Sequence, residues 1–234
     1  MTDDASAQAK SGEPFTDDAL KGKKIMPTLV DKSEEYLQSL ESEKLTFAII
    51  SIDVVGSTAL SISMSPMTYA NLISVVLWKL SAIIPQFHGH VLKYTGDGLI
   101  AYFPESRLVT KNDFVVDCAL AMRRVIYQGL ESIFKELNCP PIDVRIGIDT
   151  GEAFIKLIGD PSTKQHKDII GAVVSLAAKI QAITKPGEIY IGETTCKSLH
   201  TIWKKNVEPV ELSDDWNYAG KDGNKYMVYK LKIG

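Results

Sequence analysis

The sequence has 234 residues, of which 45% are hydrophobic and 24% are charged, so it is neither disordered nor of low complexity. Its 26 Lys and Arg residues against 29 Asp and Glu residues give a net charge of −3, which excludes the strongly basic surface of a dedicated nucleic-acid or anionic-membrane binder. The three cysteines are odd in number and lack metal-ligand spacing, which excludes a disulfide framework or zinc module and favours the reducing cytoplasm.

The N-terminal part of the chain is polar. Residues 1–24 contain almost no large apolar side chain, so we expect residues 1–43 to form a mobile extension with a short helix over 27–43, followed by one domain over 44–234. This part also lacks the pattern of a signal peptide. The most apolar segment, residues 70–87, is interrupted by Asn71, Lys79 and Pro85, so we expect no membrane insertion.

Apolar periodicity predicts the remaining elements in chain order. They are a strand over 47–53, a helix over about 72–84, a hairpin of 91–94 with 99–103 and a helix over 115–137, then strands over 142–148 and 152–157, a helix over 172–184, and strands over 188–191, 207–212 and 226–233. The neighbouring Met64, Met67 and Tyr69 are expected to pack in the core or at a dimer contact. This order predicts a mixed-sheet domain, α/β or α+β.

Two carboxylates lie at the ends of predicted buried strands. Asp53 closes the run FAIISID, and Asp97 lies inside the Gly-Asp-Gly turn of the hairpin. Each taken alone is also explained as a helix cap or an ordinary turn residue. An ionised carboxylate beside a buried strand is costly unless a partner neutralises it, and a divalent cation does so well.

The segment after Asp53 adds a second signal. Gly56, Ser57 and Thr58 lead directly into a helix, whose first backbone N–H groups suit a phosphate. Two carboxylates beside such a turn indicate a two-metal phosphoryl-transfer centre that uses Mg²⁺ or Mn²⁺.

Five stretches of the sequence resemble the class III nucleotide cyclases, which convert a nucleoside triphosphate into a cyclic nucleotide and pyrophosphate. They are residues 51–58 (SIDVVGST), 92–103 (LKYTGDGLIAYF), 144–153 (VRIGIDTGEA), 168–180 (DIIGAVVSLAAKI) and 186–195 (PGEIYIGETT). The resemblance implies an α+β, ferredoxin-like fold with a mixed, mostly antiparallel sheet and helices packed on it. It also implies a head-to-tail homodimer with two shared active sites.

The resemblance assigns roles to individual residues. The metal site falls on Asp53, Val54 and Asp97, and a triphosphate-binding arginine falls on Arg145, which is also explained as a surface arginine at a strand edge. No protein residue is required as the catalytic base, because the two ions activate the ribose hydroxyl and hold the phosphates.

Base recognition is implied at Lys93 and Asp168, which would face the metal carboxylates of the other protomer. A lysine and a carboxylate suit adenine and uracil alike, so the pair leaves the base open. The alternative explanation is an ordinary surface ion pair.

Two departures from the family pattern affect the other half of the site. Where the family has asparagine and arginine on the later helix, this chain has Ser175 and Lys179, and Lys179 keeps the charge without the bidentate geometry of arginine. Near the C-terminus Ala219 replaces a phosphate-binding lysine. Lys221 is the candidate substitute for that lysine. The alternative explanation is that Lys221 is only a charged residue at the tip of a hairpin.

A compact cyclase with these departures is similar to the stand-alone Pycsar cyclases of bacterial antiphage defence. This resemblance implies that UTP is the substrate and that cyclic UMP passes to a separate effector protein. An adenylyl cyclase is the main alternative, because of the Lys93 and Asp168 pair. A non-catalytic nucleotide-binding scaffold is the second alternative.

Overall fold

The computed structural model describes residues 27–40, 44–105, 111–163 and 165–233. The predicted mobile segment 1–24 and the end of the predicted helix at 41–43 lie outside the described residues. A domain boundary between residues 43 and 44 therefore stays a prediction.

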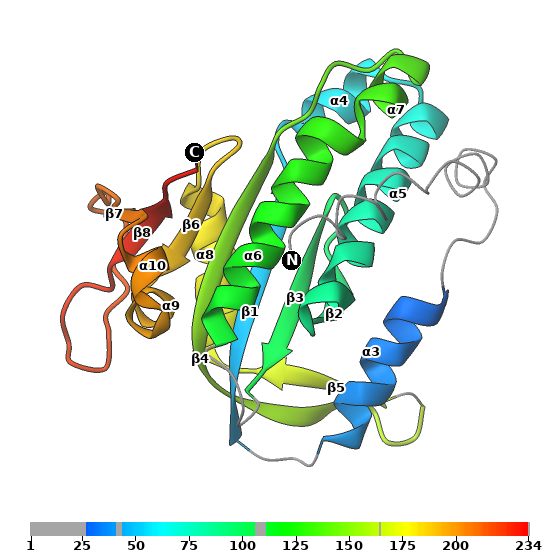
Figure 1. Cartoon of the computed structure of the whole chain (residues 1–234). Helices are drawn as coiled ribbons and strands as arrows, with labels where there is room; N and C mark the ends of the chain where they lie inside the picture. Colours follow the sequence, from blue (N-terminus) through cyan, green and yellow to red (C-terminus); the bar gives the residue numbers. More distant parts are fainter. Residues whose placement is uncertain (1–26, 41–43, 106–110, 164, 234) are drawn as a thin grey trace.

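The domain is built on one curved sheet with the strand order β2-β3-β1-β4-β6-β8-β7, and β5 pairs with β4 beside this series (Figure 1). Its strands are β1 (Lys44–Val54), β2 (His90–Tyr94), β3 (Gly98–Pro104), β4 (Val144–Gly159), β5 (Gln165–Ile170), β6 (Ile189–Gly192), β7 (Val207–Pro209) and β8 (Val228–Leu231). All strand pairs are antiparallel except β4 with β6. The predicted α+β, mostly antiparallel fold is confirmed.

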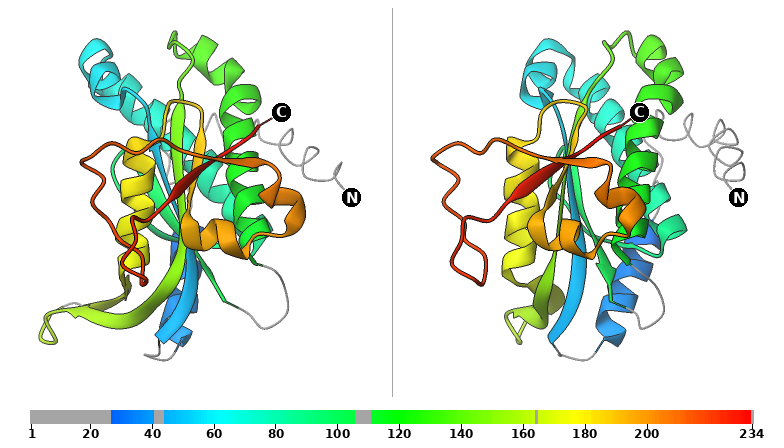
Figure 2. Two further views of the ribbon diagram at one scale, coloured as in Figure 1. Left: turned by 90° about the vertical axis from the view of Figure 1, so that its left-hand side faces the viewer. Right: turned by 60° about the vertical axis from the view of Figure 1, so that its left-hand side comes forward.

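Helices cover both faces of the sheet (Figure 2). On one face α5 (Pro66–Ile83), the short 3₁₀ turn η1 (Ile84–Phe87) and α6 (Lys111–Arg124) enclose the larger apolar cluster. On the other face α8 (Ala172–Ile183) packs on β4 and β1 and encloses a second apolar cluster. The helix α3 (Pro27–Ser39) adds Leu37 to this second cluster. The alternation of side chains along β1 supplies both clusters, since successive residues point to opposite faces.

The segment Pro66–Phe87 is long and apolar enough to span a membrane by length and composition. Half of it is buried inside the domain, where Leu72, Val76 and Leu80 belong to the apolar cluster. Its apolar character is thus explained by core packing against the sheet.

The strands predicted after residue 142 differ from the structure in two ways. The strands expected at 142–148 and 152–157 form the single strand β4, because Asp149, Thr150 and Gly151 continue the ladder opposite β1. The strand β5, which pairs with the far half of β4, was not predicted.

The helix expected over 115–137 is interrupted. It is divided into α6, a π-helical turn η2 (Val125–Gly129) and α7 (Glu131–Glu136). Arg123 Nε donates to the Gly187 carbonyl at 2.7 Å and the Tyr127 hydroxyl donates to Asp143, so contacts to the rest of the fold hold the irregular turn. The short helices α9 (Glu193–Ser198) and α10 (Thr201–Lys204) were not predicted, and β7 and β8 are shorter than expected.

Candidate active site

Asp53 and Asp97 come together where β1 ends and the β2–β3 hairpin turns. Asp53 lies opposite Gly98 in the β1–β3 ladder, so Asp97 is adjacent to it. Burial and, second, the negative charge of Asp97 raise the pKa of the Asp53 carboxyl, while a hydrogen bond from Arg145 lowers it. Two carboxylates whose charges repel one another form a site that a cation would stabilise.

Arg145 faces the first aspartate from the neighbouring strand. It lies opposite Asp53 in the β1–β4 ladder, and its Nη2 donates to Asp53 Oδ2 at 3.1 Å. Its Nε is buried and has no hydrogen-bond partner among the described residues. The side chain as a whole is 30% exposed beside the carboxylates, and the predicted contact of Arg145 with a triphosphate stays a prediction.

Two glycines shape the turns that hold the aspartates. Gly98 lies so near the backbone of β1 that a Cβ there would overlap the Ile52 carbonyl oxygen, so a side chain would push Asp97 away. Gly56 has φ 71°, a left-handed conformation that favours glycine, and it precedes α4 (Ser57–Ser63) without a side-chain cap. The predicted phosphate-binding residues Gly56, Ser57 and Thr58 therefore lie in a tight turn directly after β1.

Tyr69 is a member of this site that the sequence interpretation missed. It lies in the first turn of α5, which begins at the Ser65 cap with Pro66 at its first position. Burial and the charge of Asp97 raise the pKa of Tyr69, and a hydrogen bond with Ser57 lowers it. The cap at Ser65 is the sequence signal that could have placed this tyrosine one turn into the helix, beside the aspartates.

The donor set fits a magnesium or manganese ion that also takes oxygens from substrate and water. Among the described residues, no group of three or more His, Cys, Asp or Glu side chains is arranged to hold a metal. Mg²⁺ is commonly bound by one or two carboxylates together with substrate phosphates. Asp53 and Asp97 supply two carboxylates of this kind. Val54, the third predicted metal residue, is the last residue of β1 and follows Asp53 directly.

A groove of about 400 Å³ adjoins the same turn on the side of α4. Its lining is mostly apolar and includes Val55, Ala59, Leu60 and Ile142. Of the described residues that line it, Asp143 has the one ionisable side chain, and it is an acid. The groove therefore offers no positive charge for a polyphosphate.

Lys93 and Asp168 form an ion pair although they are 75 residues apart in the chain. Lys93 Nζ lies 2.7 Å from Asp168 Oδ2, and the other carboxylate oxygen accepts from the Ile169 backbone N–H at 2.8 Å. The structure thus brings the predicted base-reading residues together in one protomer. The same contact is expected of an ordinary ion pair, so their role stays a prediction.

Within the described part of the chain, no hydrogen bond or ion pair joins the remaining predicted residues to the aspartates. Ser175 and Lys179 are exposed one turn apart on α8. Lys221 lies in the tip of the hairpin before β8, and its Nζ is 2.9 Å from Glu152 Oε2, on the carboxylate that also pairs with Lys44. Their catalytic and phosphate-binding roles stay predictions.

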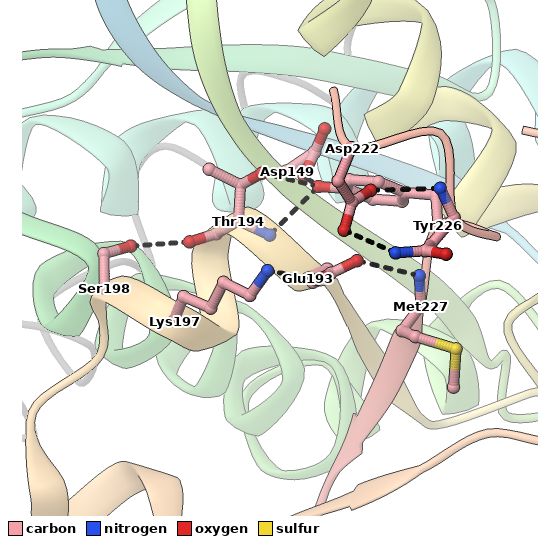
Figure 3. A network of polar contacts seen from close by, with 9 residues as sticks. Asp149, Glu193, Thr194, Lys197, Ser198, Asp222, Tyr226 and Met227 are labelled. Atoms are coloured by element: carbon pink, nitrogen blue, oxygen red, sulfur yellow. Dashed lines mark hydrogen bonds and ion pairs between the residues drawn. The ribbon is translucent and has the colours of Figure 1, made fainter. Parts of the chain in front are cut away.

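A buried polar network lies on the same face of β4 as Arg145 (Figure 3). The Tyr226 hydroxyl donates to Asp149 Oδ1 at 2.7 Å and accepts from the Thr194 backbone N–H at 3.0 Å. Burial raises the pKa of the Asp149 carboxyl to about 7. This network joins β4, α9 and the segment before β8, and nothing in the sequence interpretation indicated it.

The model of the adenylate and guanylate cyclase catalytic domain matches residues 40–232. The chain belongs to this family. The predicted resemblance to class III cyclases is therefore confirmed, and the paired aspartates lie within the matched part of this cyclase domain.

Individual relatives carry different names. The cyclase domain is 26% identical over 192 residues to a cytidylate cyclase of Escherichia coli, covering 78% of this chain and 37% of that protein. It is 24% identical over 218 residues to an adenylate cyclase of Anabaena cylindrica, covering 89% of this chain and 41% of that protein. The chain thus spans about two fifths of the length of each of these relatives.

A solved structure has the same fold. The adenylyl cyclase CyaB from P. aeruginosa superposes with a TM-score of 0.70 at 22% identity, covering 83% of this chain and 97% of that one. The α+β architecture is shared at this low identity.

Proposed function

We propose that the chain is a nucleotide cyclase that converts a nucleoside triphosphate into the 3′,5′-cyclic nucleotide and pyrophosphate. The observation that carries the proposal is the pairing of Asp53 with Asp97 at the end of β1, in a chain of the cyclase family. In this reaction the ribose 3′ oxygen bonds to the α-phosphorus, the bond from that phosphorus to the bridging oxygen breaks, and pyrophosphate leaves. The hydroxyl proton passes to solvent.

The metal half of the proposed site consists of Asp53, Val54 and Asp97, which would hold two Mg²⁺ or Mn²⁺ ions. When bound, such ions lower the pKa of the attacking hydroxyl and offset phosphate charge. The turn at 56–58 would bind phosphate, and the partly exposed guanidinium of Arg145 would give the triphosphate a charged donor. Positioning and charge neutralisation would supply most of the rate.

The second half of the site would come from another copy of the chain, as a head-to-tail homodimer. Ser175 and Lys179 are exposed on α8, where a partner can approach them. The hairpin of β4 and β5 exposes four large apolar side chains, which suits an interface. They are Phe154, Leu157, Ile158 and Ile170. Lys179 would stabilise the charge that develops on the transferred phosphorus.

UTP is our preferred substrate, giving cyclic UMP. A pyrimidine nucleotide as substrate is supported by the relative named cytidylate cyclase and by the departures from the family pattern at Ser175 and Lys179. CTP, the other pyrimidine nucleotide, is therefore the next candidate. ATP is the main alternative, supported by the Lys93–Asp168 pair and by the relative named adenylate cyclase. By resemblance to the Pycsar cyclases, we also propose a cytoplasmic enzyme whose product signals to a separate effector in antiphage defence.

The first experiment incubates the purified chain separately with ATP, GTP, CTP and UTP in the presence of Mn²⁺ and identifies cyclic products by mass spectrometry. Cyclic UMP is the expected product. Cyclic CMP would keep the pyrimidine assignment and reject UTP, whereas cyclic AMP alone would reject the pyrimidine assignment. No product from any nucleotide would reject the cyclase and favour the nucleotide-binding scaffold.

A mixing experiment tests the shared site. Asp53→Asn and Lys179→Ala are each expected to be inactive alone, because each homodimer lacks one half of both sites. A mixture after subunit exchange contains heterodimers with one intact site, so it should recover about a quarter of the wild-type activity. Each variant mixed with itself is the control, and the absence of recovery would contradict a site formed between protomers.

A further inference from the structure

The ion pair between Lys93 and Asp168 joins two strands that are not neighbours. Lys93 lies on β2 at one edge of the sheet, whereas Asp168 lies on β5, which pairs with β4. No backbone ladder joins β2 to β5 among the described residues. The 2.7 Å distance between Nζ and Oδ2 therefore depends on how β2 and β5 are each held in place.

The helix α3 contacts both of these strands, and it lies beside them in Figure 1. On the β2 side, Ser33 Oγ accepts from the Val91 backbone N–H at 3.1 Å, and the Ser33 carbonyl accepts from the Tyr102 hydroxyl at 2.8 Å. The Tyr36 ring stacks on His90, with ring centroids 4.0 Å apart and planes at 7°. These contacts cover an edge strand whose outward N–H would otherwise lack an acceptor.

The anchored part of β2 comes directly before Lys93. The register of β2 against β3 shifts between Val91 and Lys93, as at a β-bulge. A bulge changes the direction of the following side chain. Since Ser33 binds the N–H of Val91, α3 holds the strand at the point that sets the direction of Lys93.

On the β5 side the anchor is the residue next to Asp168. Lys167 Nζ donates to the Gln38 carbonyl at 2.7 Å and to the Leu40 carbonyl at 2.6 Å. These carbonyls lie at the C-terminal end of α3, where a lysine also offsets the helix dipole. Adjacent residues of a strand point to opposite faces, so holding Lys167 fixes the rotation of β5 and the direction of Asp168.

We propose that α3 positions the base-reading pair, with Ser33 and Lys167 as positioning residues, so that discrimination between nucleotide bases depends on the docking of this helix. The proposal rests on the proposed function, because the pair reads a base only if the chain binds a nucleotide substrate. Ser33 and Lys167 act through β2 and β5 and touch neither the substrate nor the ions.

The test uses Lys167→Met in the full chain, which keeps the aliphatic stem and removes both hydrogen bonds to α3. The matched control is Lys225→Met, because Lys225 Nζ also donates to a backbone carbonyl, that of Ser213 at 3.2 Å, in another part of the domain. We expect the ratio of kcat/KM for the preferred nucleotide to that for the next best to fall about tenfold in Lys167→Met, which is the effect of the base losing the equivalent of one hydrogen bond to the displaced pair. The change should lie mainly in KM. Lys167→Arg, which can still donate, should restore the ratio, and Lys225→Met should leave it unchanged.

A second readout does not require turnover. Hydrogen exchange, followed by mass spectrometry, should become faster in residues 90–94 of Lys167→Met, although the substitution lies on β5, and should stay unchanged there in Lys225→Met. An unchanged nucleotide ratio in an active enzyme, or unchanged exchange in residues 90–94, would overturn the positioning role and leave the cyclase proposal intact. A wild-type chain that makes no cyclic nucleotide would overturn the proposed function itself.

Discussion

The substitution Tyr226→Phe tests the buried network around Asp149. It removes one hydroxyl and keeps the ring in its cluster with Trp216 and Tyr190. The hydroxyl donates to Asp149 Oδ1 at 2.7 Å and accepts from the Thr194 N–H at 3.0 Å. Its loss removes one hydrogen bond from each of these two groups, and Asp149 keeps its hydrogen bond with the Thr150 backbone.

The expected loss of stability follows from those two groups. A hydrogen bond to a charged group contributes about 1.5–3 kcal/mol and an ordinary one about 0.5–1.5 kcal/mol, so Tyr226→Phe should lower the free energy of unfolding by about 2–4 kcal/mol. For a domain of this size, that corresponds to a fall in Tm of roughly 5–15 °C.

The loss should also depend on pH. The pKa of Asp149 in the folded chain, about 7, lies above its ordinary value of 3.8. The stabilising contribution of Asp149 is thus fully present below about pH 4 and is lost as the pH rises through 7. The tyrosine hydroxyl favours the charged carboxylate, and this effect lowers the pKa of Asp149. Removing the hydroxyl should therefore cost more at pH 8, where Asp149 is ionised, than at pH 6.

Urea unfolding at pH 6 and pH 8 measures this difference. Tryptophan fluorescence is a suitable signal, because Trp216, one of the three tryptophans, donates from its Nε1 to the Tyr226 carbonyl at 2.8 Å. Tyr229→Phe on β8 is the control, since its hydroxyl lies outside this network. A stability difference between wild type and Tyr226→Phe that is equal or smaller at pH 8 would refute the reasoning.

Two further predictions concern the aspartate site. Mn²⁺ at one hundred times its Kd should stabilise the wild-type chain by about 3 kcal/mol and should not stabilise Asp53→Asn, as measured by calorimetry; an equal response of both proteins would contradict a metal site at Asp53. Gly98→Ala should cost about 1–3 kcal/mol in chemical denaturation, because the new Cβ overlaps the Ile52 carbonyl. Gly129→Ala is its control, where a Cβ would meet Val125 at an ordinary 3.5 Å, and equal losses would argue against a close approach at Gly98.

The sequence predicted the elements whose signals are local. The run 47–53 is apolar on both faces, and the structure buries β1 between two helical layers. The break expected between 148 and 152 was wrong because Asp149, Thr150 and Gly151 are common in turns. Their strand conformation depends on the ladder with β1 and on Tyr226, 77 residues further along the chain.

In the candidate site, too, the residues with a local sequence signal were predicted from that signal and the others were not. Asp53 and Asp97 stand out because a carboxylate at the end of a buried strand needs a partner. Tyr69 was interpreted as core or dimer packing together with Met64 and Met67, because its place in the sequence does not show that it hydrogen-bonds with Ser57. The pair of Lys93 and Asp168 came from family resemblance, because no local pattern links residues on β2 and β5.

The alternation of side chains in β1 and β4 places the aspartate site and the larger apolar cluster on opposite faces of the sheet. On β4, Arg145 and Asp149 point to the face under α8, whereas Ile146 and Ile148 point into the larger apolar cluster on the other face. Gly147 lies between the two polar residues, and a Cβ there would overlap the backbone of α8, so the helix packs directly over this face. Substitutions on the α8 face can therefore alter the aspartate site while the cluster under α5 and α6 remains packed. Such a division lets paired carboxylates persist at the end of a strand whose other face stabilises the fold.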